Sequence, residues 1–462
     1  MTHTSRTRPW RLHESGRMSE TDAADPEAQP RDIGRKVAIG RLFASLLSLG
    51  LLGLLAFAGY HERDYRQMAR GLDAELAALR RLRWEPPPLR VAAGDGNAAD
   101  DIYAALSGWK PLSPAMRESL ASKVYYGQQP SAADNTALAE RAPALRALRT
   151  AAFQRWARTD LVAELGDQMR VPDYSRAIEA SLGLLINAEA AGAEECLQRA
   201  AEVIRIGQSL VPAAPLEAVS VSTHMTALAA RVIARCAQGT DLNGLRRAAH
   251  ELRMLATHPA PIGSCIEFEE IVTAMQLRNQ AALSNKLSPV DVIRTAWLRP
   301  QLMAAWTPHQ AATRFRRITA ERYPDALEEW KREQDVRLQS EFAQVREASE
   351  HVLGRMLDDM RGQALLRMLS VGLHTLAERA YRGMLPPQPA GLRDPQLLDP
   401  FRGQAFGYRV ASNGVELTLW SVGEDFRDEA GSDDWAQTGP RDVTLHFPLG
   451  PRPAPQIARR RL

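Results

Sequence analysis

The sequence predicts a mainly α-helical protein with a single transmembrane helix, an irregular α-helical array or bundle, and a small C-terminal antiparallel β-sheet. Three features predict this fold class: an uncharged apolar run near the N-terminus, a long stretch with apolar residues at helical spacing, and an alternating pattern after Met384. The chain has 462 residues, of which 45% are hydrophobic and 24% charged. This composition excludes collagen, a wholly disordered chain and a polytopic transporter.

The apolar run covers residues 42–60 and contains no charged side chain. A helix of this length, rising about 1.5 Å per residue, spans a hydrocarbon core of about 30 Å. The preceding polar residues 1–41 are predicted to be a disordered segment. More basic residues precede the run (Arg31, Arg35, Lys36, Arg41) than follow it closely (Arg63, Arg66, Arg70). This bias predicts a cytoplasmic N-terminus, and therefore a single-pass protein of the inner (cytoplasmic) membrane with the bulk of the chain exported.

A cleaved signal peptide is the alternative interpretation of the same run. Residues 42–55 resemble an apolar signal core, and Ala56 and Ala58 flank Phe57 in the small-x-small pattern of a cleavage site. The polar leader before the run is longer than an entire ordinary signal peptide, which favours an uncleaved anchor. Both interpretations place the bulk of the protein outside the cytoplasm.

Residues 61–84 are predicted to form a helical stalk that continues from the membrane span. Their apolar residues recur at spacings of three and four: Tyr65, Met68, Leu72, Leu76, Leu79 and Leu82. Such a stripe favours either a homodimer through the stalk or packing on the protein's own helical body. Three consecutive prolines then end the helix, so residues 85–96 are predicted to be a Pro-rich linker.

Residues 97–385 are predicted to form an α-helical domain. One helix pair is expected on either side of Gly192, and another around Gly239, with Asp241 as the N-cap of the following helix. No regular repeat period runs through the region, so an irregular array is predicted. The charge-rich residues 311–380 are expected to include a long, partly exposed helix.

The chain has three cysteines, Cys196, Cys236 and Cys265, all in apolar helical surroundings. An odd number leaves one cysteine without an intramolecular partner. One disulfide and three buried thiols both fit this pattern.

Residues 386–462 are predicted to form a small β domain after a linker that contains Pro386, Pro387 and Pro389. Asn413-Gly414 predicts a type I′ hairpin turn. Few contacts are expected to cross the proline segment, so that the tail behaves as a separate module. Three alternating runs predict its strands: Phe406, Tyr408 and Val410; Val415, Leu417 and Leu419; Val443, Leu445 and Phe447.

A spaced set of residues in this tail resembles the C-terminal part of the major pseudopilin of type II secretion. The set is Asp399-Pro400-Phe401-Arg402-Gly403-Gln404, Tyr408-Arg409, Trp420-Ser421-Val422-Gly423-Glu424-Asp425, Asp428 and Gly431. The resemblance covers about 50 residues, 399–447, and implies a pseudopilin-like sheet.

The same resemblance implies a structural calcium ion held by Asp425, Asp428 and Asp433, with Glu429 and Asp434 nearby. Clustered carboxylates suit this oxygen-seeking cation. The alternative is a solvated acidic turn whose charge Arg427 balances.

The N-terminal part departs from the pseudopilin family. Residues 40–43 read Gly-Arg-Leu-Phe, which is no prepilin-peptidase site, and no glutamate occurs within residues 42–60. The resemblance therefore implies a shared fold module and not assembly into a pseudopilus. The whole chain resembles bacterial membrane-anchored envelope proteins with the same layout, a resemblance that implies no activity.

No catalytic motif such as HExxH, GxSxG or a P-loop occurs, and a net charge of +3 gives no indication of nucleic-acid binding. Adjacent pairs such as Glu350-His351 point in different directions on a helix and predict no site. We predict a non-catalytic envelope scaffold that binds envelope proteins, with secretion-system components among the expected partners.

The alternative is an exported, hydrolase-type enzyme with a dispersed site in the helical domain. A deep pocket that brings together several of His224, His250, Glu267, Glu269 and Glu270 favours the enzyme, whereas a shallow groove favours the scaffold.

Overall fold

The structure is a computed structural model that forms two units, Met1–Asp64 and Tyr65–Leu462. It describes residues 29–81, 94–156, 173–212, 214–257, 262–263, 265–266, 268–269, 328–329, 332, 343–389, 394–423, 427–428, 430–431 and 442–450.

A single helix, α1 (Gln29–Arg81), carries the apolar run. Within it, Val37–Tyr60 has a mean hydropathy of 2.1 and is long and apolar enough to cross a membrane. The predicted span is therefore confirmed as a candidate and begins five residues earlier than expected. The prediction of disorder is wrong for residues 29–41, which are helical: Pro30 lies in the first turn, where its missing N–H removes no hydrogen bond, and no proline follows before Tyr60.

Residues 61–81 of the predicted stalk are helical, as part of α1. The last residues of the predicted Pro-rich linker, 94–96, are not a linker, because they belong to a strand, β1 (Gly94–Asn97). It pairs in parallel with β2 (Gln154–Trp156), a strand within the predicted helical domain. The rest of the linker lies outside the described residues. Asn97 then begins the next helix, where its side chain accepts a hydrogen bond from the Ala99 N–H at 3.2 Å.

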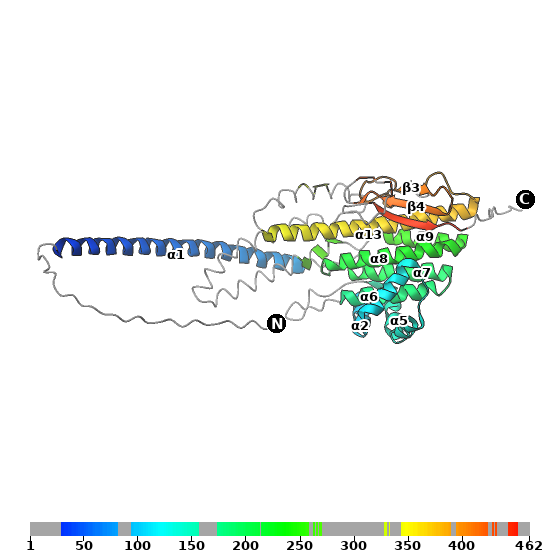
Figure 1. The fold of residues 1–462 in the computed structure, drawn as a ribbon, viewed down its shortest axis with the longest axis horizontal. Coiled ribbons are helices and arrows are strands. Elements are labelled where there is room, and N and C mark those ends of the chain that lie inside the picture. Colours follow the sequence, from blue (N-terminus) through cyan, green and yellow to red (C-terminus); the bar gives the residue numbers. More distant parts are fainter. Residues whose placement is uncertain are drawn as a thin grey trace, which may run out of the picture. The chain divides into compact units, whose positions relative to one another are not determined.

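The region after β1 is predominantly helical, as predicted (Figure 1). Its helices are α2 (Ala98–Ser107), α3 (Pro114–Tyr126), α4 (Ala132–Ala139), α5 (Ala142–Ala151), α6 (Tyr174–Glu189), α7 (Ala193–Leu210), α8 (Glu217–Cys236), α9 (Leu242–Thr257) and α13 (Ala343–Arg382), with the 3₁₀ turns η2 (Ala237–Gly239) and η5 (Pro395–Leu397). Helix α7 packs on α8, and α13 packs on both α8 and α9. The long helix α13 confirms that residues 311–380 include a long helix. Most of the first half of that range lies outside the described residues.

Two of the helix boundaries lie at the glycine and N-cap residues that the sequence predicts. Gly192 adopts φ 94° at the turn between α6 and α7, a conformation that a residue with a Cβ rarely takes. The Asp241 carboxylate accepts a hydrogen bond from the Gly244 N–H at 2.7 Å, which confirms the predicted N-cap of α9.

The predicted three-stranded antiparallel sheet is present, in the order β3 (Gly407–Val410), β4 (Glu416–Ser421) and β5 (Val443–Pro448). The turn between β3 and β4 is not the predicted type I′ turn, since Gly414 has a positive φ of 68° but Asn413 does not. The Gly414 N–H instead closes a turn onto the Ala411 carbonyl at 2.8 Å, and the connection is longer than two residues.

The sheet shares one hydrophobic core with the helices, so the prediction that few contacts cross the proline segment is wrong. Leu417, Leu419 and Phe447 are buried in the same cluster as the apolar residues of α13. The Phe447 ring covers Gly372 of α13, where an added Cβ would lie only 2.2 Å from the ring. In Figure 1 the sheet lies against α13. The apolar faces of β4 and β5 are buried by this contact, which explains why the tail is not separate.

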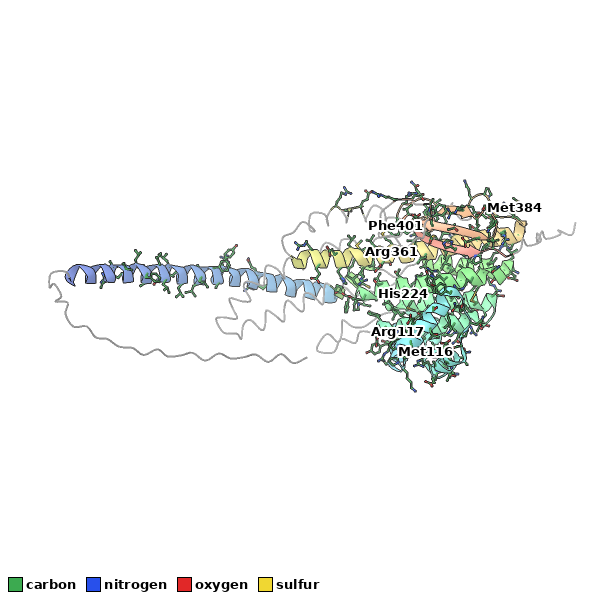
Figure 2. The ribbon with its side chains drawn as sticks, in the orientation of Figure 1. Met116, Arg117, His224, Arg361, Met384 and Phe401 are labelled. Carbon is green, nitrogen blue, oxygen red and sulfur yellow. A yellow bond between two sulfur atoms is a disulfide. The ribbon has the colours of Figure 1, made fainter. Side chains whose placement is uncertain are left out.

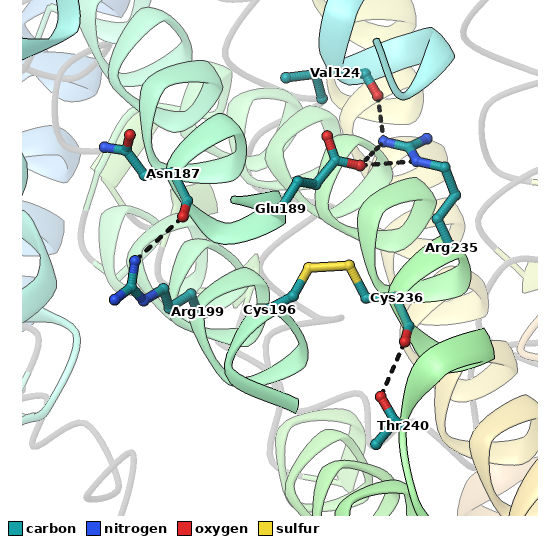
Figure 3. Close-up of a disulfide and its surroundings, with 8 residues drawn as sticks. All are labelled: Val124, Asn187, Glu189, Cys196, Arg199, Arg235, Cys236 and Thr240. Atoms are coloured by element: carbon teal, nitrogen blue, oxygen red, sulfur yellow. Dashed lines mark hydrogen bonds and ion pairs between the residues drawn. A yellow bond between two sulfur atoms is a disulfide. The ribbon is translucent and has the colours of Figure 1, made fainter. Parts of the chain in front are cut away.

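Cys196 of α7 and Cys236 of α8 form a disulfide, with their Cα atoms 6.2 Å apart (Figure 3). Cys265 is a free, buried thiol. Of the two alternatives for the three cysteines, the structure therefore contains the single disulfide, and it links two helices that already pack together.

Candidate functional site

A groove of about 370 Å³ lies on the surface formed by α5, α6 and α7, and it is open to solvent. Its apolar floor includes Leu145 and Leu184, both buried. Charged residues stand around this floor: Arg146, Arg149, Glu195, Arg199 and Glu202. The three arginines outnumber the two glutamates, so the groove carries an excess of positive charge.

The charged residues of the groove are ordered by pairing. Arg149 donates two hydrogen bonds to the buried Glu202 carboxylate, at 2.7 and 3.2 Å, which is the two-point geometry that makes such pairs strong. Arg199 pairs with Glu195. It also donates to the Asn187 carbonyl at 3.2 Å, as Figure 3 shows. Arg146 is exposed, and among the described residues no side chain pairs with it. Its guanidinium therefore supplies the excess charge.

Of the residues expected to converge in an enzyme, the three that the structure describes do not line this groove. His224 is exposed on α8 (Figure 2), and His250 is exposed on α9. Glu267 and Glu270 lie outside the described residues, whereas Glu269 is described and half-buried. Among the described residues, this groove therefore does not bring the expected histidines and glutamates together.

A second site brings together Glu217, Glu269 and His351, whose ligand atoms all lie within 4.8 Å of one another. Glu217 lies in the first turn of α8, and His351 lies on α13. His351 Nε2 is 3.7 Å from Glu217 Oε1, and the Leu216 N–H donates to Glu269 Oε1 at 3.2 Å. Sequence reasoning missed this site because the three residues come from distant segments, and no spacing in the sequence connects them.

A small apolar cluster holds the second site in place. Leu216, Ile266 and Val352 are fully buried members of it, and they adjoin or closely precede the three site residues in the chain. Cys265 belongs to the same cluster, and its thiol donates to the Val211 carbonyl at 2.9 Å. Burial raises the pKa of this thiol far above its ordinary value, so it stays protonated and is no reactive thiolate.

Two carboxylates, Glu217 and Glu269, concentrate negative charge at the second site. Burial raises the pKa of Glu269, and the neighbouring Glu217 carboxylate raises it further, against the hydrogen bond from Leu216. Burial and the same two carboxylates, together with Cys265, raise the pKa of Tyr174 well above its ordinary value. The Tyr174 hydroxyl is shielded from solvent and has no hydrogen-bond partner within the described part of the chain.

Of the residues implied for calcium, only Asp428 is described; Asp425, Asp433, Glu429 and Asp434 lie outside the described residues. The Asp428 carboxylate accepts hydrogen bonds from Trp420 Nε1 at 2.9 Å and from the Ala430 N–H at 3.0 Å. It also pairs with Arg402 at 3.3 Å, whereas the sequence points to Arg427 as the balancing charge. The hydrogen bond from Trp420 is the main cause that lowers the pKa of Asp428. The calcium site stays a prediction.

Asp399, at the start of the pseudopilin-like motif, has a structural role in the tail. Asp399 is buried and accepts hydrogen bonds from the Phe401 N–H at 3.0 Å, the Ser421 hydroxyl at 2.7 Å and the Val422 N–H at 3.2 Å. These contacts join the turn before β3 to the end of β4. Burial nevertheless raises the pKa of Asp399, which the three hydrogen bonds oppose.

Comparison with known proteins finds no similar protein. No protein-family model matches the chain, and no curated protein and no solved structure is significantly similar to it. The resemblance of the tail to a pseudopilin therefore stays a prediction, carried by the motif residues alone.

Proposed function

We propose that the protein is a membrane-anchored, non-catalytic scaffold whose helical region lies outside the cytoplasm and binds another protein. The observation that carries this proposal is the groove formed by α5, α6 and α7, with its apolar floor and its excess of arginine. Its two carboxylates, Glu195 and Glu202, are both paired with arginines, and its described lining contains no histidine, serine or cysteine. A surface of this kind suits recognition of a protein segment.

The candidate span Val37–Tyr60 supports the membrane anchor, and the excess of basic residues before it supports a cytoplasmic N-terminus in the inner membrane. The Cys196–Cys236 disulfide supports export of the helical region, because structural disulfides persist in oxidising compartments and are rare in the cytosol.

The groove chemistry supports a particular kind of partner. An apolar side chain of the partner would lie on Leu145 and Leu184, and an adjacent carboxylate would pair with Arg146. The pseudopilin-like motif of the tail makes secretion-system components of the envelope reasonable partners, and the stalk within α1 offers a means of forming a homodimer.

The groove is tested by charge reversal in the full-length protein, followed by cross-linking in native membranes and purification. We expect Arg146→Glu to remove the specific partner, because it places a carboxylate opposite the partner's own acidic residue. Lys110→Glu is the matched control, since Lys110 is exposed, lies outside the groove lining and undergoes the same change of charge. Partners that cross-link equally to both variants, or no partner above background with the unaltered chain, would contradict the proposal.

A further inference from the structure

We infer that Glu217, Glu269 and His351 bind one divalent transition-metal ion, with zinc as the best match, and that this ion fastens α13 to the start of α8. The inference is independent of the protein-binding groove, which lies on other helices.

The spacing of the three ligand groups suits one small ion. Ligand atoms around a tetrahedral zinc ion, each about 2.0–2.1 Å from the metal, lie about 3.4 Å from one another. His351 Nε2 and Glu217 Oε1 are already 3.7 Å apart, and all three ligand atoms fall within 4.8 Å. The Glu217 side chain is partly exposed, so its rotamer can adjust to a bound ion.

The donor set selects the class of metal. Calcium and magnesium take oxygen ligands, so the His351 imidazole argues against both. One imidazole and two carboxylates suit zinc and its first-row neighbours. Three protein ligands leave one position of a tetrahedral ion for water.

A buried hydroxyl provides a second, separate indication of a ligand. The Tyr174 oxygen is shielded from solvent and has no hydrogen-bond partner among the described residues, and it lies close enough to Glu217 and Glu269 to sense their charge. Buried polar groups are seldom left unpaired, because an unmade hydrogen bond destabilises the fold. A bound water or ligand beside the site would give this hydroxyl a partner.

The surrounding structure fixes the positions of the three ligand residues. Buried residues of one apolar cluster, Leu216, Ile266 and Val352, lie next to or near each ligand in the chain. The Leu216 N–H holds Glu269 at 3.2 Å. Since the ligands come from segments far apart in the sequence, a shared ion would close long loops of the chain, and its main effect would be on stability.

The rival account is a simple ion pair between protonated His351 and Glu217, with no metal. Zinc binding separates the two accounts. The full-length protein, purified in detergent and freed of metal with a chelator, is dialysed against zinc chloride and the bound metal is counted. Cobalt(II) chloride is then added to a second sample, because the visible absorption of cobalt reports tetrahedral coordination. We expect one zinc ion per chain, a tetrahedral cobalt spectrum, and a zinc-dependent rise in melting temperature.

Variants assign the metal to this site. His351→Gln is expected to weaken zinc binding at least about tenfold and to abolish both the cobalt spectrum and the zinc-dependent rise in melting temperature. His250→Gln is the matched control, because His250 is exposed on α9 and is not part of the site. Glu217→Gln, a partly exposed and nearly isosteric change, repeats the test if the His351 variant is poorly folded. Less than one zinc ion per chain, or equal zinc binding by the His351 and His250 variants, would overturn the inference.

Discussion

Replacing Phe447 with alanine is expected to lower the free energy of unfolding by about 3–5 kcal/mol, because the ring is fully buried between the sheet and α13. The variant loses the apolar area of the ring and leaves a cavity over Gly372. Denaturant unfolding of the detergent-purified chain, followed by tryptophan fluorescence, measures this loss.

Gly372→Ala tests the same contact, because the sign of its effect on the free energy of unfolding depends on whether the sheet packs on α13. If the sheet did not pack here, alanine would stabilise α13 by about 1 kcal/mol through its higher helix propensity. With the Phe447 ring in place, the new Cβ would lie 2.2 Å from it, and we expect destabilisation by about 1–3 kcal/mol. Combining Gly372→Ala with Phe447→Leu is expected to destabilise the protein by less than the sum of the single changes, because the smaller side chain makes room. Strict additivity, or stabilisation by Gly372→Ala alone, would show that the tail does not dock on α13.

Removal of the Cys196–Cys236 disulfide is the second change with a large expected effect. The two cysteines are 40 residues apart, and a cross-link of this span restricts the unfolded chain by about 4 kcal/mol in the loop-entropy account. The double variant Cys196→Ala/Cys236→Ala is therefore expected to melt well below the unaltered protein. A reducing agent should lower the stability of the unaltered protein and leave that of the double variant unchanged.

Cys265→Ala provides the matched control for the disulfide, because it also removes a buried cysteine sulfur but breaks no cross-link. It should retain the sensitivity to reductant. If reductant affects the double variant as strongly as the unaltered protein, the disulfide is not the source of the stability.

Local patterns in the sequence are sufficient to predict many elements of this fold, although not the strands β1 and β2. The apolar run predicts the span within α1, the helical periodicity predicts the helices on either side of Gly192, and the alternation predicts all three strands of the sheet. Each of these features depends on residues close together in the chain, where side-chain period and secondary structure are directly linked.

The contacts between distant segments could not be predicted in this way. The parallel pairing of β1 with β2 and the burial of Phe447 on Gly372 depend on residues far apart in the chain. The prolines before the tail predict a boundary, but a proline ends a helix without preventing the next element from packing back on it. The sequence does not indicate the Glu217–Glu269–His351 site for the same reason, because the three residues are neighbours in space and not in the chain.

Membrane topology tests the proposed anchored, exported arrangement of the chain most directly. A reporter enzyme that is active only outside the cytoplasm is fused after Arg83, and the intact protein is separately fractionated and its N-terminus sequenced. The account predicts an active reporter and an intact chain that remains in the inner-membrane fraction after salt washing. An inactive reporter, or a soluble product that begins at Gly59, would contradict it.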